Sequence, residues 1–328
     1  MAESLASRLV QQARDRLAAT EPIVARTSPL APLSSMQAGI WFLEQLSPGT
    51  NAWNLGTQLR FDGPLDVDAL AHAIHDLQDR HESLRTRLRM HGDVPVQEVG
   101  DRIDLRIHDL RALDVDAREL RSASLRTEQR RAFQLDNAAL WRADLVRISD
   151  NESWLWVTIH HIISDGSSID VLVRDVRELY TARLERRPAV LPPLPIQFAD
   201  YAAWEQAQLA SDAGSRRLQQ WIGRLQGVAR VDLPGRTVQT LHRMRPAGRA
   251  RCIIPASIGL PLRRLCAQED VTIFMGLAAA FNVLLARYSG TEDIAFGSPA
   301  ANRYHRDTRN VMGPFLNTLV LRTDLTGA

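Results

Sequence analysis

Two adjacent histidines, an aspartate and a glycine are the residues of this sequence best suited to chemistry. His160, His161, Asp165 and Gly166 follow the apolar run Trp154–Ile159 and precede an amphipathic helix. A loop between a buried strand and a helix is held by a rigid scaffold and often carries reactive side chains. One histidine could present a ring nitrogen to a substrate. Asp165 could orient that ring or pair with an arginine, and Gly166 could let the backbone turn sharply.

The same residues also fit a structural role, as two histidines at the edge of the core and an aspartate that caps a helix. The loop alone leaves both interpretations open. A metal site is less well supported, because adjacent histidines rarely chelate one ion and no third ligand is close in sequence. We therefore expect no metal here.

The elements that position this loop are predicted from apolar spacing. Trp154–Ile159 is apolar at nearly every position, which is typical of a central strand covered on both faces. Ser167 and Asp170 match the S-x-x-D pattern of a capping box, which predicts where the next helix begins. Four prolines in Pro188–Pro195 then predict a stiff connector between two domains.

The same spacing rules apply along the rest of the chain. They predict helices at residues 1 to about 20, 35–46, 70–77, 117–132, 196–209, 217–225, 258–268 and 271–288. They predict further strands at 53–61, 84–90, 94–99, 103–107, 140–148, 251–254, 293–296 and 317–323. This mixture indicates an α/β fold, an α+β sandwich, rather than a bundle or a barrel.

Composition excludes several functions. All 40 basic residues are arginine, so a phosphate-binding lysine, a lysine Schiff base and a lysine general base are ruled out. Charges of both signs alternate and the net charge is +2, so we expect no nucleic-acid-binding patch. No run approaches the roughly 18 apolar residues of a membrane span. Two cysteines (Cys252 and Cys266) and no secretory signal favour the cytoplasm.

At the double-histidine loop the sequence resembles the condensation domains of nonribosomal peptide synthetases. Their HHxxxDG signature stands here as His160–Gly166, and four further motifs of that family occur in the family's order. The five matching segments are Leu33–Leu43, Arg80–Thr86, His160–Gly166, Phe198–Trp204 and Met312–Thr318, the last continuing to Arg322.

The resemblance implies a fold of two chloramphenicol acetyltransferase-like lobes in a V-shaped pseudo-dimer. We expect an N-terminal helix or docking segment at 1–28, an N-terminal lobe at 29–187, the connector at 188–195 and a C-terminal lobe at 196–328. The last two motifs of the family are not found before Ala328. The second lobe is therefore expected to be incomplete at its C-terminus.

The resemblance also implies a reaction. Condensation domains join a donor acyl or peptidyl thioester to the α-amine of an acceptor aminoacyl thioester, forming an amide bond. Both substrates arrive on the phosphopantetheine arms of donor and acceptor carrier proteins, and adjacent synthetase modules are further partners. No cofactor of the chain's own, no nucleic acid and no membrane is implied.

Site roles follow from the family pattern. His161 would lie where the amine attacks, as a general base or by positioning, while His160 would be structural. Asp165 would hold the loop with an arginine of the second lobe, for which Arg303 is the candidate. The backbone N–H of Gly166 would stabilise the oxyanion. Asn317 and Ser164 are candidates for lining the substrate tunnel.

Other readings stay open. Within the family, two histidines exclude a heterocyclisation domain and count against a purely recruiting domain, and an epimerisation domain fits the other motifs poorly. An acyltransferase that uses coenzyme A is an enzymatic alternative, and a truncated fragment that binds carrier proteins is a non-enzymatic one. Trp41, Phe42, Tyr201 and Trp204 are predicted to be packing residues.

Overall fold

The computed structural model describes residues 22–136, 139–234, 248 and 250–327. The helix expected at residues 1 to about 20 lies outside this part. The described residues group into two compact bodies. A larger body contains residues 22–216 and 300–317, and a smaller body contains residues 217–299 and 318–327.

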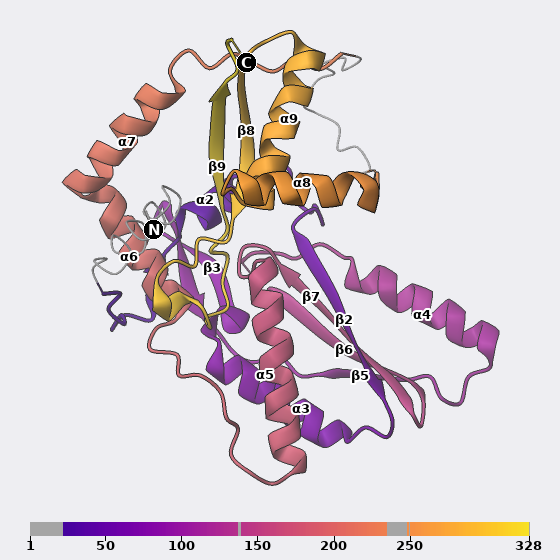
Figure 1. The fold of residues 1–328 in the computed structure, drawn as a ribbon. Helices are drawn as coiled ribbons and strands as arrows, with labels where there is room; N and C mark the ends of the chain where they lie inside the picture. Colours follow the sequence, from indigo (N-terminus) through magenta and orange to yellow (C-terminus); the bar gives the residue numbers. More distant parts are fainter. Residues whose placement is uncertain (1–21, 137–138, 235–247, 249, 328) are drawn as a thin grey trace. The chain divides into compact units, whose positions relative to one another are not determined.

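Most regular structure of the larger body comes from the first half of the chain (Figure 1). Its strands are β1 (Leu30–Pro32), β2 (Asn54–Asp62), β3 (Thr86–His91), β4 (Val94–Val99), β5 (Arg106–Asp109), β6 (Trp141–Ser149) and β7 (Glu152–His160). Its helices are α2 (Ser35–Leu46), α3 (Val67–Arg80), α4 (Val115–Gln129), α5 (Gly166–Leu184) and α6 (Phe198–Ala210), with short 3₁₀ turns η1 (Glu82–Arg85) and η2 (Arg306–Thr308).

A four-stranded sheet carries the double-histidine loop. Its order is β2-β7-β6-β5, in which β7 is antiparallel to both neighbours and β5 is parallel to β6. Strands β1, β4 and β3 form a second, antiparallel sheet. The predicted central strand is confirmed, since β7 has a partner on each side.

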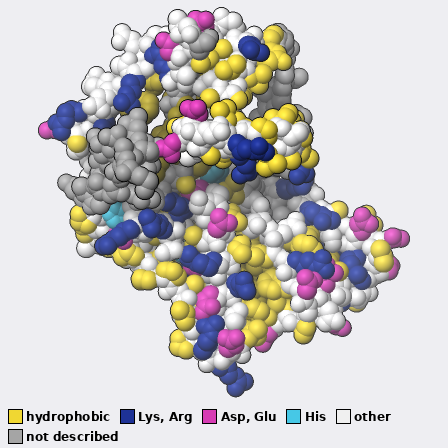
Figure 2. All heavy atoms as spheres, in the orientation of Figure 1, with side chains coloured by type: hydrophobic (Ala, Val, Ile, Leu, Met, Phe, Trp, Pro, Cys, Tyr) yellow, Lys and Arg dark blue, Asp and Glu magenta, His cyan; other side chains and the backbone are white. Residues whose placement is uncertain are grey.

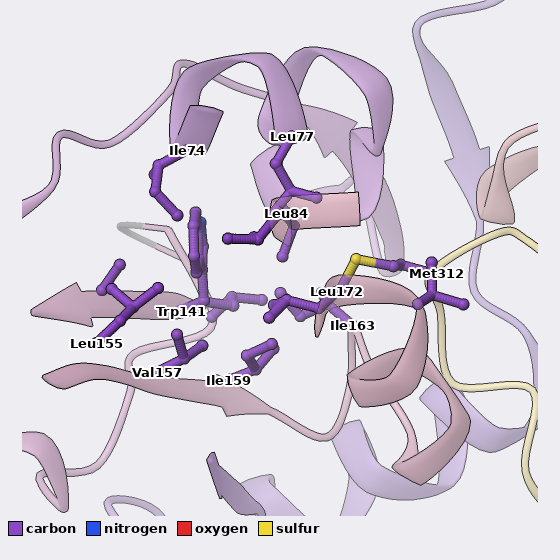
Figure 3. Packing of buried hydrophobic residues seen from close by; sticks show 14 of the residues in the cluster. Ile74, Leu77, Leu84, Trp141, Leu155, Val157, Ile159, Ile163, Leu172 and Met312 are labelled. Carbon is purple, nitrogen blue, oxygen red and sulfur yellow. The ribbon is translucent and has the colours of Figure 1, made fainter. Parts of the chain in front are cut away.

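Alternate residues of β6 and β7 are buried on opposite faces of the sheet, as the period of a strand requires. Leu145, Leu155 and Val157 belong to the main apolar core, beneath α3 and α5, whereas Val146 and Trp156 pack with Leu125 of α4 on the other side. Figure 3 shows side chains from the helices meeting those of the strands in the main core. The strand that ends at His160 is therefore held from both faces.

Several predicted boundaries shift by a few residues, and one strand is wrong. Residues 251–254 form no strand. Ile253 and Ile254 are 77 % and 53 % exposed, so apolar residues stand there without the neighbouring strand that would bury them. The strand expected at 103–107 is β5 at Arg106–Asp109, and the first residues of the strand expected at 84–90 form η1 instead.

The aromatic packing predictions differ in outcome. Tyr201 is buried in a small cluster with Phe198 and Phe315, and Trp204 packs against it. Trp41 is half-buried against the main core. Phe42 is 57 % exposed, so its prediction as a core residue was wrong; it lies on the outer side of α2, whereas Gln37, Ile40 and Glu44 face inward.

The smaller body contains most of α7 (Asp212–Leu225), with α8 (Ala256–Gln268), α9 (Ile273–Ser289), β8 (Asp293–Ala300) and β9 (Asn317–Asp324). Strands β8 and β9 pair as a two-stranded sheet. Asn282 of α9 donates a hydrogen bond to Thr323 Oγ1 at 2.9 Å, and Arg322 pairs with Asp293 at 2.6 Å. These polar contacts join α9 and β8 to β9.

The domain boundary expected after residue 195 does not coincide with this grouping. The proline-rich segment 188–195 has no regular structure and joins α5 to α6 inside the larger body. Helix α6 groups there because it contacts β1, α2 and η1. Residues 300–317 return to the same body, where Phe315 stacks edge-on against Phe198 at 4.9 Å between ring centres.

Charged side chains of both signs are mixed over the face of the molecule shown in Figure 2. Among the described residues no single helix has the length and apolar character to cross a membrane. The bent pair Ala256–Gln268 and Ile273–Ser289 passes that test only when its two helices are taken together.

Candidate functional site

Backbone hydrogen bonds fix both histidines at the end of β7. The His160 N–H donates to Leu140 O at 2.8 Å, and the His161 N–H donates to Trp53 O at 2.7 Å. Trp53 directly precedes β2, whose Asn54 is paired with His160. The two strands that flank β7 thus set the position of the double-histidine loop.

His160 is a buried, neutral residue in this arrangement. It is 1 % exposed, and its Nδ1 accepts the Ile162 N–H at 3.2 Å. Burial, together with the smaller effect of the neighbouring His161, lowers the pKa of His160 to about 4. A neutral imidazole whose Nδ1 accepts a hydrogen bond carries its proton on Nε2. The geometry therefore agrees with the structural position that the family pattern implied for His160.

His161 is half-buried, and its ring nitrogens have different surroundings from those of His160. Its Nδ1 is buried and has no hydrogen-bond partner among the described residues. The Trp53 ring lies edge-on to it, with 6.4 Å between ring centres and 75° between planes. Nε2 is then the nitrogen that can meet a reacting group. Its role as base or positioning group remains a prediction.

Asp165 ties the loop together without touching either imidazole in the contacts described. It is the N-cap of α5, and its carboxylate accepts both the N–H and the Oγ–H of Ser168 at 2.8 Å. Its other oxygen accepts the Phe315 N–H at 3.2 Å. The predicted Ser167–Asp170 capping box was wrong: Asp165 and Ser168 form the box, because the helix begins two residues earlier than that pattern required.

Arg303 pairs with Asp165, as expected, at 2.9 Å from Nη2 to Oδ1. The same guanidinium donates to Thr308 O and Val311 O at 2.7 and 2.6 Å, and it lies over the Phe315 ring at 4.3 Å. Arg303 and Asp165 belong to the same body, whereas the arginine was expected from a second lobe.

Gly166 opens α5 but does not supply a sharp turn. Its φ is outside the left-handed region, and a Cβ added to it would meet nothing within 4 Å. The prediction that glycine is needed here for its conformational freedom was therefore wrong. Its N–H belongs to the first turn of a helix, where N–H groups have no intrahelical acceptor, so the expected oxyanion contact stays a prediction.

The two tunnel candidates have different surroundings. Ser164 is completely buried, and its Oγ lies 3.4 Å from the backbone O of Asp165, so it does not fit a residue that lines an open tunnel. Asn317 is the first residue of β9 and is exposed. Its tunnel role remains a prediction.

The second family motif forms a separate buried network beside α5. His81 Nε2 lies 2.9 Å from Asp175, and Arg80 Nε lies 2.8 Å from the same carboxylate oxygen. Both His81 and Asp175 side chains are fully buried. Arg85 bonds instead to the backbone oxygens of Gln78 and Gly100. This motif therefore fastens α3 to α5, and no side chain of it is placed in the double-histidine loop.

Sequence reasoning missed Glu44, which lies below the loop. Its Oε1 is 3.6 Å from His160 Nε2, and the residue is 6 % exposed. It also lines a cavity of about 680 Å³ together with Trp41, Leu88 and Phe133. No local pattern marks Glu44, because its partner is distant in sequence. No group of three or more His, Cys, Asp or Glu side chains that could hold a metal occurs in the described part of the chain.

Comparison with known proteins gives consistent matches. The family model described as "Condensation domain" matches residues 28–328. Chondramide synthase cmdD of Chondromyces crocatus is 37 % identical over 97 % of this chain and 8 % of its own length. Phosphinothricin tripeptide synthetase PhsC of Streptomyces viridochromogenes is 38 % identical over 89 % of this chain and 27 % of its own. The chain thus spans only a small part of these curated relatives.

Solved structures match most of the chain. The X-domain from teicoplanin biosynthesis is 30 % identical with a TM-score of 0.77, covering 94 % of this chain and 68 % of that chain. The first condensation domain of the calcium-dependent antibiotic synthetase has a TM-score of 0.70, covering 91 % and 70 %. At 23 % identity, this second likeness concerns the fold alone.

Proposed function

Because this chain belongs to the condensation-domain family, we propose that it is an acyltransferase that forms amide bonds in nonribosomal peptide synthesis. The acceptor amine attacks the carbonyl carbon of the donor thioester, the C–N bond forms and the C–S bond breaks. The donor acyl group is now bonded to the acceptor nitrogen, and the phosphopantetheine arm of the donor carrier leaves as a thiol, which takes up the proton lost by the amine. The synthases and synthetases among the curated relatives support this reaction.

The observation that carries the proposal is the position of His161. Its backbone N–H donates to Trp53 O and its Nδ1 is buried, which leaves Nε2 as the ring nitrogen that would meet a substrate amine. A general base placed in this way contributes about 10² to 10⁴ in rate. Orientation of the amine by a hydrogen bond contributes through proximity.

Partners supply both substrates in this proposal. Donor and acceptor carrier proteins, each with a phosphopantetheine arm, present the thioesters, and adjacent synthetase modules carry those proteins. The chain needs no cofactor of its own for the transfer. We propose that the reaction takes place in the cytoplasm, which the low cysteine content of the sequence favours.

An intact-mass assay tests the reaction. One carrier protein is loaded with an acyl donor and another with an aminoacyl acceptor, and both are mixed with the chain, its His161→Ala variant or its His72→Ala variant. His72 is exposed on α3 and serves as the control. We expect condensed product on the acceptor carrier with the chain and with His72→Ala, and loss of product with His161→Ala. Product formed equally by all three proteins would contradict the proposed role of His161.

A second candidate is recruitment of another protein without catalysis. It is favoured by one observation: the X-domain structures are 30 and 31 % identical to this chain, and one of them is a complex with OxyB. Binding of a carrier protein or a synthetase-associated enzyme without any condensed product would support recruitment. Transfer from an acyl-coenzyme A donor, with no transfer from a loaded carrier, would instead indicate a coenzyme A-dependent acyltransferase.

A further inference from the structure

Two buried polar groups face each other behind the double-histidine loop and are used by no step described above. Glu44 Oε1 of α2 lies 3.6 Å from His160 Nε2 of β7, and their side chains are 6 % and 1 % exposed. Neither atom has a hydrogen-bond partner among the described residues. An unsatisfied buried donor or acceptor is costly, typically by about 1–3 kcal/mol. A small movement within this pair would satisfy both atoms.

The hydrogen bond on the other side of the imidazole decides which group is the donor. His160 Nδ1 accepts the N–H of Ile162 at 3.2 Å, so the ring proton of neutral His160 is on Nε2. The carboxyl oxygen Oε1 of Glu44 lies 3.6 Å from that nitrogen. A carboxyl group accepts such a proton through either of its oxygens.

The surroundings favour a neutral imidazole rather than an ion pair. Phe133 lies edge-on to His160, with 6.0 Å between ring centres, and with Trp41 and Leu88 it lines the same cavity as Glu44. Burial raises the pKa of Glu44 and lowers that of His160 to about 4, so both shifts disfavour the charged pair. His161 is the other titratable group that acts on His160.

We infer that Glu44 is a positioning residue of the double-histidine loop. Its carboxyl group accepts a hydrogen bond from the Nε2–H of His160, and this bond keeps His160 in the tautomer whose Nδ1 accepts the Ile162 N–H. His161 lies between His160 and Ile162 in the chain, so the contact between Glu44 and His160 acts on the backbone on both sides of His161. The inference rests on the proposed function for its effect on turnover, but the tautomer of His160 can be measured without any reaction.

The decisive measurement is ¹⁵N NMR of histidine-labelled protein, with the His160 signals assigned by their loss in His160→Asn. The variants are Glu44→Gln, which keeps an acceptor, and Glu44→Met, which removes it at similar volume. Gln45→Met is the matched control, because Gln45 is the exposed neighbour on α2 and lines the same cavity. We expect the Nε2–H tautomer in the unsubstituted protein, in Glu44→Gln and in Gln45→Met, and a mixture of tautomers in Glu44→Met.

Turnover provides the second measurement. In the carrier-protein assay we expect kcat of Glu44→Met to fall about tenfold with KM unchanged, and Glu44→Gln to recover most of it, as a positioning effect requires. An unchanged tautomer in Glu44→Met would overturn the inference even if turnover fell. A changed tautomer in a chain without turnover would support the positioning contact while contradicting the proposed function.

A double-mutant cycle covers the case in which Glu44→Met is poorly folded. In a His160→Asn background the Nε2 donor is absent, so Glu44→Met should cost less stability there than in the unsubstituted protein. Equal costs in the two backgrounds would show that Glu44 and His160 do not interact, and would overturn the inference.

Discussion

Arg303 Nη2 lies 2.9 Å from Asp165 Oδ1, across 138 residues of sequence. Both side chains are buried, at 9 % and 1 % exposure. The contact fastens residues 300–317 to the first turn of the helix that follows the double histidine, because the same guanidinium also donates to Ser168 Oγ and Gly313 O. Loop geometry at His161 therefore depends on a segment far along the chain.

Replacing Arg303 by methionine should destabilise the protein strongly. The substitution leaves the Asp165 carboxylate buried without its cation, and breaking a buried pair in this way costs about 3–5 kcal/mol. Urea denaturation measures the free energy of unfolding. Arg306→Met is the matched control, because the Arg306 side chain is 88 % exposed. A loss for Arg303→Met no larger than that of the control would show that the pair does not hold the loop.

Substituting Gly166 by alanine separates folding from catalysis. A Cβ at this position meets nothing within 4 Å and φ is not left-handed, so the melting temperature should not fall. If the Gly166 N–H lies against the reacting carbonyl, the added methyl group would displace the substrate, and a shift of about 1 Å can cost about 10²-fold in rate. Thermal denaturation and the carrier-protein assay are measured on the same preparation. Turnover equal to that of the unsubstituted chain would remove Gly166 from the site.

Fold features with a strong local signal were predictable from the sequence. The apolar run Trp154–Ile159 is a central strand with both faces covered, and the alternation from Trp53 to Phe61 is the edge strand β2. The strand expected at 251–254 failed because apolar composition was its only support. Whether such a segment becomes a strand depends on a neighbouring strand, which the spacing of its own residues does not reveal.

The site residues likewise divide into those that a sequence pattern revealed and those that it did not. Arg303 was found because a family motif pointed to an arginine partner for Asp165. The N-cap of α5 was predicted at the wrong residue. Asp165 and Ser168 complete a capping box only through the bond in which the Asp165 N–H donates to Ser168 Oγ at 3.3 Å, and the sequence pattern does not reveal that bond. Glu44 was missed because its approach to His160 arises only when the folded chain brings these two residues, far apart in sequence, together.

Acidification should weaken the fold through the buried histidines. The folded pKa of His160 is about 4, because of burial and then of His161, and its unfolded value is near 6.5. Between these values the unfolded chain binds more protons, so stability is fully present above about pH 6.5 and falls as pH drops toward 4. Burial also lowers the pKa of His81, which acts in the same direction.

For His160 alone, the free energy of unfolding should fall by about 2 kcal/mol between about pH 7.5 and pH 5, since each pKa unit corresponds to about 1.4 kcal/mol. Urea denaturation at the two pH values measures this slope. His160→Asn should flatten it, whereas His72→Asn, at an exposed position, should leave it unchanged. An equally steep slope in His160→Asn would mean that other groups cause the pH dependence.

A pair of glycine substitutions tests the packing that supports Arg303. A Cβ on Gly313 would lie 2.1 Å from Phe198 Cδ2, and Phe198 is buried at 2 % exposure against Phe315. Gly313→Ala must therefore displace an aromatic ring on which Arg303 depends through Phe315, and overpacking of this kind typically costs about 1–3 kcal/mol.

Gly39 provides the matched control for that substitution. It lies inside α2, and a Cβ there meets nothing within 4 Å. Gly39→Ala should stabilise the protein by about 0.4–1 kcal/mol, because alanine loses less backbone freedom on folding. Urea denaturation of both variants should thus give changes of opposite sign. Because the Gly313 N–H donates to Ser168 Oγ, Gly313→Ala should also lower turnover. Unchanged turnover together with lost stability would show that this packing supports the fold without positioning the loop.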